Sequence, residues 1–210
     1  QKIDKVASAI KECVEMGVQV GLVIGGGNFW RGVKNGSGKM QRSHADSMGM
    51  LATVMNAIAV ADVLEQHGLD ARLLTAVEMN KFAEYFTRDV ANRYLNEGKV
   101  VLFAAGTGNP YFSTDTGMML RAVELKCDVL LSAKNVDGVY DSDPAKNPDA
   151  KKYDTLTYNE SLAKNLNAID LTASAIGREN GMPALIFGLS HPENITRAVM
   201  GENIGTLITE

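Results

Sequence analysis

The sequence predicts an α/β fold built on a largely parallel sheet, and two observations carry this prediction. Short apolar runs rich in β-branched residues, at residues 18–24 and 100–105, have the composition of buried strands. Segments with helical periodicity alternate with such runs along almost the whole chain. Parallel strands need crossover connections, so this alternation predicts a doubly wound sheet, and 210 residues suit one domain.

Apolar spacing and glycine stops locate most of the helices. The first has Ile3, Val6, Ile10 and Cys13 at helical spacing, with Gly17 placed to end it. Further helices are expected over residues 87–97 and 115–125, and after the capping-box patterns that open at Thr157 and Ser190. The remaining strands are expected at residues 71–75, 128–132, 184–187 and 206–209.

A long helix is expected over residues 47–67, ending at Gly68. One of its faces is apolar and rich in methionine, with the members Met48, Leu51, Met55 and Ile58. Methionine side chains fill irregular gaps in protein cores. We therefore expect this face to lie in the hydrophobic core.

Composition and charge argue against a nucleic-acid-binding protein and against a membrane protein. A net charge of −4 argues against a nucleic-acid partner, because phosphate backbones are bound by clustered lysine and arginine. Cys13 and Cys127 are the only cysteines, which favours a reducing compartment. No uninterrupted apolar run approaches the roughly 20 residues of a membrane helix. We expect a cytoplasmic protein with no membrane partner.

Three loops follow expected strands, where open α/β sheets bind their ligands. They cover residues 25–32, 106–114 and 137–144. The first reads Gly-Gly-Gly-Asn-Phe-Trp-Arg-Gly, whose glycines let backbone N–H groups approach an anion closely. Arg31 offers a forked cation for phosphate oxygens. The alternative is a tight strand-to-helix turn with Arg31 in solvent.

Two familiar phosphate motifs do not fit the glycine-rich region. A P-loop around Lys39 would need Gly at Val33 and Ser or Thr at Met40. A dinucleotide fingerprint starting at Gly25 would need Gly at Trp30. The loop is therefore a different kind of phosphate loop or a plain turn.

The second loop places hydroxyl groups, an amide and two aromatic rings within residues 106–116. This density of donors and acceptors beside ring faces suits a base and a sugar. Ser113 or Thr114 also suits the N-cap of a following helix, and both interpretations are compatible.

The third loop offers three carboxylates, Asp137, Asp141 and Asp143, together with Tyr140. These carboxylates suit Mg²⁺ or the orientation of a lysine, and Tyr140 suits contact with a nucleobase. A cluster of Asp, Gly and Pro also fits a plain turn. Asp170, considered alone, fits a helix N-cap.

Taken together, these segments closely resemble the bacterial uridylate kinases of the amino acid kinase superfamily. The matching segments are residues 23–32, 46–56, 105–115, 136–144 and 200–208, and Gly-Thr-Gly-Asn-Pro-Tyr-Phe at 106–112 is the most specific. The resemblance covers essentially the whole chain. It implies a three-layer α/β/α sandwich with a largely parallel central sheet, and transfer of the γ-phosphoryl group of ATP to UMP in pyrimidine nucleotide biosynthesis.

The resemblance also assigns site residues by position. On the UMP side they are Gly26, Asp46, Thr107, Gly108, Asn109, Pro110, Tyr111, Phe112, Ser113 and Thr114, with Asp46 near the ribose hydroxyls. On the ATP side they are Gly27, Arg31, Lys134, Tyr140 and Asp143. At Lys134 the family often has Thr or Asn. Arg31 would act on the transferred phosphoryl group, and Asp143 and Asp170 would orient a lysine or a metal.

Further properties rest on the resemblance alone. It implies a homohexamer that depends on Mg²⁺, is activated by GTP and is inhibited by UTP, with direct metal ligands not assigned. Family members begin with a strand carrying Lys-Leu-Ser-Gly, whereas this sequence opens inside the following helix. We expect residues 1–210 to be one domain lacking that strand, and the natural polypeptide to be longer at its N-terminus.

Two other functions stay open. A kinase of the same superfamily would phosphorylate carbamate or an amino-acid carboxylate to an acyl phosphate. A non-catalytic sensor would bind uridine nucleotides without turnover. The hydroxyl-rich loop at residues 107–114 favours a pyrimidine nucleotide as the acceptor.

Overall fold

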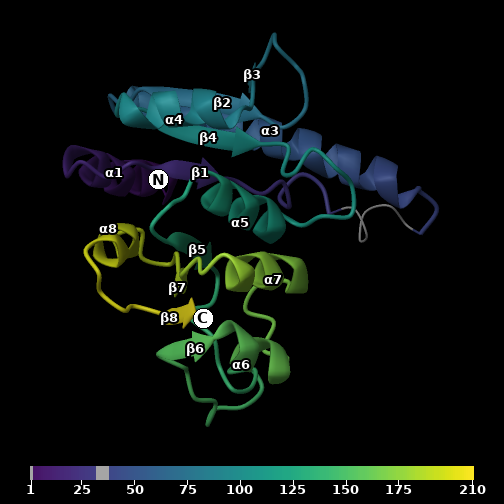
Figure 1. Ribbon diagram of the computed structural model, residues 1–210, viewed down its shortest axis with the longest axis vertical. Helices are drawn as coiled ribbons and strands as arrows, with labels where there is room; N and C mark the ends of the chain where they lie inside the picture. The colour runs from purple at the N-terminus through teal and green to yellow at the C-terminus, as the bar shows by residue number, and fades with distance from the viewer. Residues whose placement is uncertain (1, 32–37) are drawn as a thin grey trace. The chain divides into compact units, whose positions relative to one another are not determined.

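The computed structural model describes residues 2–31 and 38–210, so position 32 of the first predicted loop lies outside the described residues. The chain divides into two compact units, Gln1–Met118 and Met119–Glu210. Each unit contains a four-stranded sheet with helices beside it (Figure 1). The assignment of residues 1–210 to one domain stays a prediction.

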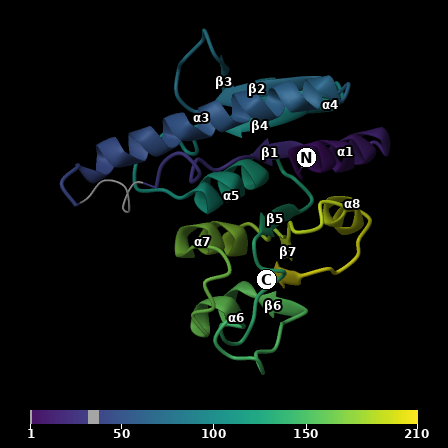
Figure 2. The same cartoon turned by 180° about the vertical axis from the view of Figure 1, so that it is seen from behind.

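The first unit has a fully parallel sheet with the strand order β1-β4-β2-β3. Its strands are β1 (Gly21–Val23), β2 (Ala71–Thr75), β3 (Glu84–Tyr85) and β4 (Val100–Ala104). Its helices are α1 (Lys2–Glu15), α3 (Arg42–Gln66) and α4 (Arg88–Asn96). Helix α4 lies in front of the sheet in Figure 1, and α3 lies in front of it when the molecule is seen from behind in Figure 2.

The core of this unit is built around β4. All five residues of this strand are buried. An unbroken apolar run of this kind is typical of a strand that is covered on both faces. In the sheet, Leu102 is in register with Leu22 on one side and Leu73 on the other. Ile10 of α1 and Leu64 of α3 belong to the same buried cluster.

The second unit has a mixed sheet with the order β5-β7-β8-β6, in which β7 and β8 are antiparallel. Its strands are β5 (Leu130–Lys134), β6 (Thr155–Thr157), β7 (Ala184–Gly188) and β8 (Thr206–Thr209). Its helices are α6 (Tyr158–Ala163), α7 (Leu171–Glu179) and α8 (Asn194–Val199). Helix α5 (Thr114–Glu124) contains the boundary between the units.

The predicted α/β class, with a parallel sheet flanked by helices, is confirmed. Thr157 also forms the predicted capping box, because its hydroxyl accepts from the Glu160 N–H and the Glu160 carboxylate accepts from the Thr157 N–H. The second predicted capping box is wrong. Helix α8 begins at Asn194 without a side-chain cap, because backbone carbonyls of the preceding turn accept its first N–H groups.

The apolar face of α3 does not fill the core, which corrects the sequence-based expectation. Met48, Leu51, Met55 and Ile58 are 40%, 55%, 52% and 43% exposed. The helix instead buries Val54, Ala57 and Leu64 in the core cluster that contains Val100 and Leu102 of β4. We define these four exposed residues as the α3 apolar face.

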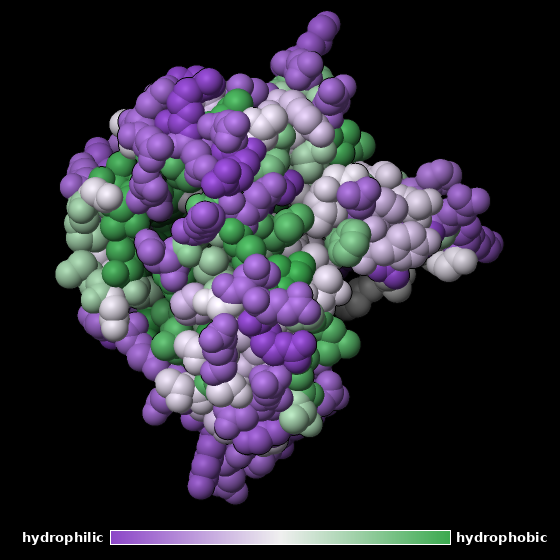
Figure 3. Space-filling view, viewed as in Figure 1, coloured by the Kyte–Doolittle hydropathy of each residue, from purple (hydrophilic) through white to green (hydrophobic). Residues whose placement is uncertain are grey.

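Among the described helices, α3 is long and apolar enough to cross a membrane by length and composition. Core helices of soluble proteins pass the same test, and α3 packs against β2 and β4. The space-filling view shows apolar residues reaching the surface between hydrophilic ones (Figure 3).

Candidate nucleotide site

The glycine-rich loop that follows β1 lies directly against α3. Gly26 is buried, and a Cβ atom there would lie 2.8 Å from the Ala52 Cβ and 2.9 Å from the Gly49 carbonyl oxygen. Real Cβ atoms do not approach other atoms this closely, so the packing requires glycine. Arg31 follows the glycines and its Nε donates to the Gly27 carbonyl at 3.0 Å. The loop thus combines closely packed backbone with a cation.

Asp46 joins the start of α3 to the second predicted loop. Its Oδ2 accepts from the Tyr111 N–H at 2.8 Å and from the Arg42 Nε at 3.0 Å. The Arg42 guanidinium carbon lies 5.3 Å from the centre of the Tyr111 ring. Tyr111 has a φ of 71°, in the left-handed region that a side chain rarely adopts. Asp46 and Arg42 therefore hold a strained residue of this loop.

The second loop is a run of tight turns that ends in a capped helix. Gly108 has a φ of 77°, and a Cβ atom there would lie 2.8 Å from the Ala76 carbonyl oxygen. The Thr107 hydroxyl accepts from the Asn109 N–H at 3.2 Å. The Ser113 hydroxyl accepts from the Thr116 N–H at 3.1 Å, which confirms Ser113 as a cap of α5. The loop at residues 106–114 thus also supplies the N-cap of α5, which the sequence analysis had allowed.

The second unit contains a pocket of about 410 Å³, within the usual size range for small-molecule sites. It brings together the three ATP-side residues predicted in this unit, Lys134, Tyr140 and Asp143. Residues that no sequence pattern assigned to a site also line it: Lys164, Asn165, Leu166, Asn167, Ala168 and Ile186.

Hydrogen bonds order the loop on one side of this pocket. The Tyr140 hydroxyl donates to the Asp137 Oδ1 at 2.8 Å, and the Lys152 Nζ lies 3.4 Å from the Asp137 Oδ2. The Tyr140 hydrogen bond, together with the Lys152 charge, lowers the pKa of Asp137 and the same hydrogen bond raises the pKa of Tyr140. The Asp143 Oδ1 accepts from the Ala145 N–H at 2.9 Å. The loop at residues 137–144 is therefore both an ordered turn and one wall of the pocket.

Asp170 is the N-cap of α7, since its Oδ1 accepts from the Ala173 N–H at 2.7 Å. This confirms the interpretation of Asp170 as a helix cap. Its role in orienting a lysine or a metal stays a prediction.

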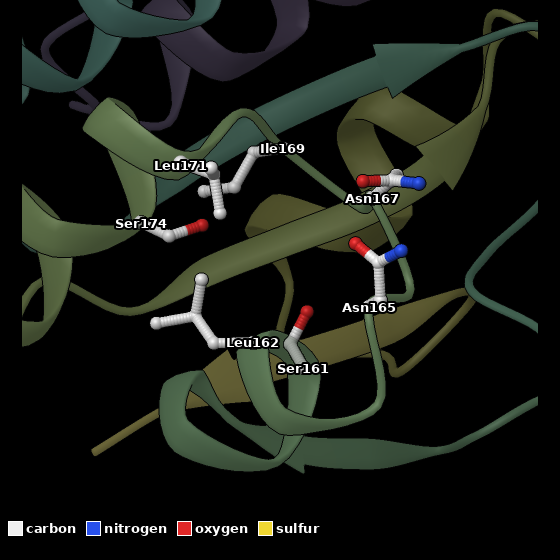
Figure 4. A pocket seen from close by; sticks show the side chains of 7 residues that line it. All are labelled: Ser161, Leu162, Asn165, Asn167, Ile169, Leu171 and Ser174. Atoms are coloured by element: carbon white, nitrogen blue, oxygen red, sulfur yellow. The ribbon is translucent and has the colours of Figure 1, made fainter.

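A smaller pocket in the second unit does not suit a nucleotide (Figure 4). Its volume is about 10 Å³, room for a single water molecule. The Asn165 and Asn167 amides lie on one side of it, and Leu162, Ile169 and Leu171 are among the other lining residues.

Comparison with known proteins places the chain in a family. It matches the amino acid kinase family over residues 1–188. This chain belongs to the amino acid kinase family. Among solved structures, the chain is similar to UMP kinase from Bacillus anthracis. The match covers 99% of this chain and 86% of the UMP kinase chain, with a TM-score of 0.95 and 35% identity. UMP kinase from Ureaplasma parvum matches 99% and 88%, with a TM-score of 0.94 and 35% identity. Uridylate kinase from Archaeoglobus fulgidus matches 99% and 92%, with a TM-score of 0.77 and 30% identity.

In this member of the amino acid kinase family, the predicted site residues fall into two groups. The first unit contains Gly26, Gly27 and Arg31 on the glycine-rich loop, which packs against α3. It also contains Asp46 on α3 itself and residues 107–114 on the loop that Asp46 contacts. The second unit contains Lys134, Tyr140, Asp143 and Asp170. Within the described residues, no cluster of three His, Cys, Asp or Glu side chains suits a metal ion.

Proposed function

We infer that this protein is a UMP kinase, which transfers the γ-phosphoryl group of ATP to UMP and yields UDP and ADP. The observation that carries this conclusion is the similarity to the UMP kinase from Bacillus anthracis over 99% of the chain at a TM-score of 0.95. The pocket of about 410 Å³ that holds Lys134, Tyr140 and Asp143 supports ATP as the donor.

The reaction needs no general base. The acceptor is a phosphate oxygen of UMP, which is largely anionic at neutral pH. The barrier comes from repulsion among phosphates and from charge on the transferred group, so positioning and cations supply the catalysis. Arg31 has the forked geometry that suits phosphate oxygens, and the amides of residues 25–27 add donors.

Each unit supplies its own recognition elements. In the first unit, Asp46 suits hydrogen bonds to the ribose hydroxyls, while residues 107–114 offer hydroxyls and amides to the uracil base. In the second unit, Tyr140 suits the adenine ring, and Lys134 suits the ATP phosphates. Catalytic roles for Arg31 and Asp170 belong to this proposal.

Mg²⁺ belongs to the proposal as an ion that enters with ATP. The described residues include no cluster of three potential metal ligands. Mg²⁺ characteristically binds substrate phosphates plus one or two carboxylates, and it would neutralise phosphate charge.

Assembly, regulation and location are also proposed. A homohexamer would bury the α3 apolar face, which monomeric proteins rarely expose. Activation by GTP, inhibition by UTP and a cytoplasmic location rest on the resemblance to bacterial uridylate kinases.

A coupled assay of the full-length protein with UMP, CMP and dTMP tests the function. We expect Mg-ATP-dependent turnover of UMP, with kcat/KM for CMP at least about tenfold lower. The wrong base would leave buried polar groups of the 107–114 loop unpaired, a cost of several kcal/mol at most. Equal kcat/KM for UMP and CMP would contradict the assigned specificity, and binding of UMP without turnover would contradict the kinase.

A further inference from the structure

The side chain of Asn56 on α3 makes three hydrogen bonds, all of them to the glycine-rich loop. Its Nδ2 donates to the Gly25 carbonyl at 2.7 Å and to the Asn28 Oδ1 at 2.6 Å. The Asn28 Nδ2 donates back to the Asn56 Oδ1 at 3.2 Å. Rotating the Asn56 amide by half a turn would place oxygen against the Gly25 carbonyl oxygen, so the pattern admits one orientation. Asn56 thus holds the loop at two points.

The end of the same loop is attached to α3 by Trp30. The Trp30 Nε1 donates to the Ala45 carbonyl at 2.8 Å. The N–H groups of Phe29 and Trp30 both donate to the Gly26 carbonyl at 3.0 Å. The loop is therefore a compact turn, with Asn56 at its start and Trp30 at its end.

We propose that Asn56 is a positioning residue for the phosphate-binding loop. It holds the Gly25 carbonyl and the Asn28 amide, and Gly27 lies between these two points in the chain. The Gly27 carbonyl in turn accepts from the Arg31 Nε at 3.0 Å. Asn56 thereby sets the position of the backbone and the cation that act on the phosphates. The catalytic consequence rests on the proposed function, whereas the effect on the loop does not.

The surroundings of its hydrogen-bond partners indicate that Asn56 positions the loop and contributes little to the stability of the fold. Gly25 and Asn28 are exposed, so water can replace the bonds that Asn56 makes to them. Removing Asn56 should leave folding almost unchanged and should release the loop. Trp30 reports on this directly, because it is the only tryptophan in the sequence and lies in the loop.

The test compares Asn56→Ala, Asn56→Asp and Asn28→Ala, with Gln66→Ala as a control. Asn56→Asp keeps the acceptor for Asn28 but loses the donor to Gly25. Gln66 also bonds a side chain of α3, Asp62, at 2.6 Å, far along the helix from Asn56. The readouts are acrylamide quenching of Trp30 in the ligand-free protein, kcat and KM for UMP, and the thermal midpoint.

We expect both Asn56 variants to increase Trp30 quenching about twofold and to lower kcat about tenfold, with a nearly unchanged thermal midpoint. Asn28→Ala should show part of the effect, and Asn28→Ala combined with Asn56→Ala should be no worse than Asn56→Ala alone. Gln66→Ala should match the wild type.

Several results would overturn the proposal. Wild-type quenching in Asn56→Ala would show that the residue does not hold the loop, even if kcat fell. A lower thermal midpoint with unchanged kcat and quenching would show a structural role only. Absence of UMP turnover in the wild type would refute the proposed function, while Trp30 quenching would still decide whether Asn56 positions the loop.

Discussion

At the scale of single residues, the candidate site depends on close packing and on strained backbone. Gly26 is seated on α3, where a Cβ atom would approach three atoms of the helix to 3.0 Å or less. Tyr111 keeps a φ of 71° while its N–H donates to Asp46. Strain of this kind costs on the order of 1–3 kcal/mol and persists only where neighbours impose it. Asp46 is therefore both a candidate for binding the ribose and a support for the loop that contains Tyr111.

Gly26→Ala should displace the glycine-rich loop, because the atoms it would meet include the backbone of α3. We expect kcat/KM for UMP to fall at least about a hundredfold, since small displacements at a catalytic site are costly. Gly25→Ala is the matched control, because its new Cβ would lie 3.8 Å from the Thr114 hydroxyl, an ordinary contact. Steady-state kinetics of the two variants check this, and equal losses would contradict it.

Arg31→Ala and Asp46→Asn should separate catalysis from binding. Arg31 should act mainly as charge develops on the transferred group, so its removal should lower kcat. Asp46 should bind the ribose, which does not change during transfer, so Asp46→Asn should raise KM for UMP. Initial rates over a range of UMP concentrations measure both. If Asp46→Asn abolished kcat at saturating UMP while Arg31→Ala left kcat intact, the roles would be misassigned.

At the scale of elements, α3 is the shared support of both loops in the first unit. The Thr53 hydroxyl accepts from the Ala105 N–H at 2.8 Å, just before the second loop. Asp46 holds Tyr111 later in that loop, and Asn56 holds the glycine-rich loop. Positions 46, 53 and 56 repeat at seven and three residues, so they share one side of the helix. One helix side therefore sets the positions of both loops.

Helix packing in the second unit depends on a glycine. A Cβ atom on Gly177 of α7 would lie 2.5 Å from the Tyr158 hydroxyl oxygen and 2.7 Å from its Cζ. Tyr158 is 1% exposed, and its hydroxyl donates to the Met182 carbonyl. Burial also raises the pKa of Tyr158 to about 12, so the ring stays neutral. A rigid, buried ring cannot move aside cheaply.

Gly177→Ala should destabilise the protein by about 1–3 kcal/mol, the usual cost of overpacking. Gly49→Ala in α3 is the contrasting variant, because its new Cβ would have only the Trp30 Cδ1 near it, at 4.0 Å. There, the higher helix propensity of alanine should stabilise the protein by up to about 1 kcal/mol. Urea unfolding of both variants measures the difference. A stabilised Gly177→Ala variant would show that α6 and α7 can separate.

At the scale of the whole molecule, each compact unit contains its own group of nucleotide-binding candidates. The first unit has the glycine-rich loop and Asp46, and the second has the pocket with Lys134 and Tyr140. Within the part of the chain that the structure describes, the four members of the α3 apolar face are 40–55% exposed. Burial of an aliphatic side chain is worth about 1.5–3 kcal/mol, so contact with a second copy would be favourable.

Met55→Glu should weaken self-association, because a carboxylate would have to be buried without a partner. Light scattering after size exclusion should show a smaller mass for this variant than for the wild type. Met16→Glu is the matched control, since Met16 is 47% exposed at the end of α1 and outside the α3 apolar face. An unchanged mass in Met55→Glu would show that this face is not an interface between copies.

Sequence alone determined the α/β class and most of the elements. Helical spacing and a glycine stop predicted α1, an unbroken apolar run predicted β4, and the Thr157 pattern predicted a capping box. These features are local, because they depend on residues within a few positions of one another. The motif at residues 106–112 identified the family in the same way, since its specificity is contained in seven consecutive residues.

Tertiary structure alone decided which surfaces are covered and which distant residues meet. Periodicity showed that α3 has an apolar face, but only packing showed that other residues of the helix, Val54, Ala57 and Leu64, join the core of the sheet. No pattern linked Asn28 to Asn56, which are 28 residues apart, or placed residues 164–168 beside Tyr140. Such contacts depend on how whole elements pack, and hydrophobic spacing within one element does not encode what its neighbour will be.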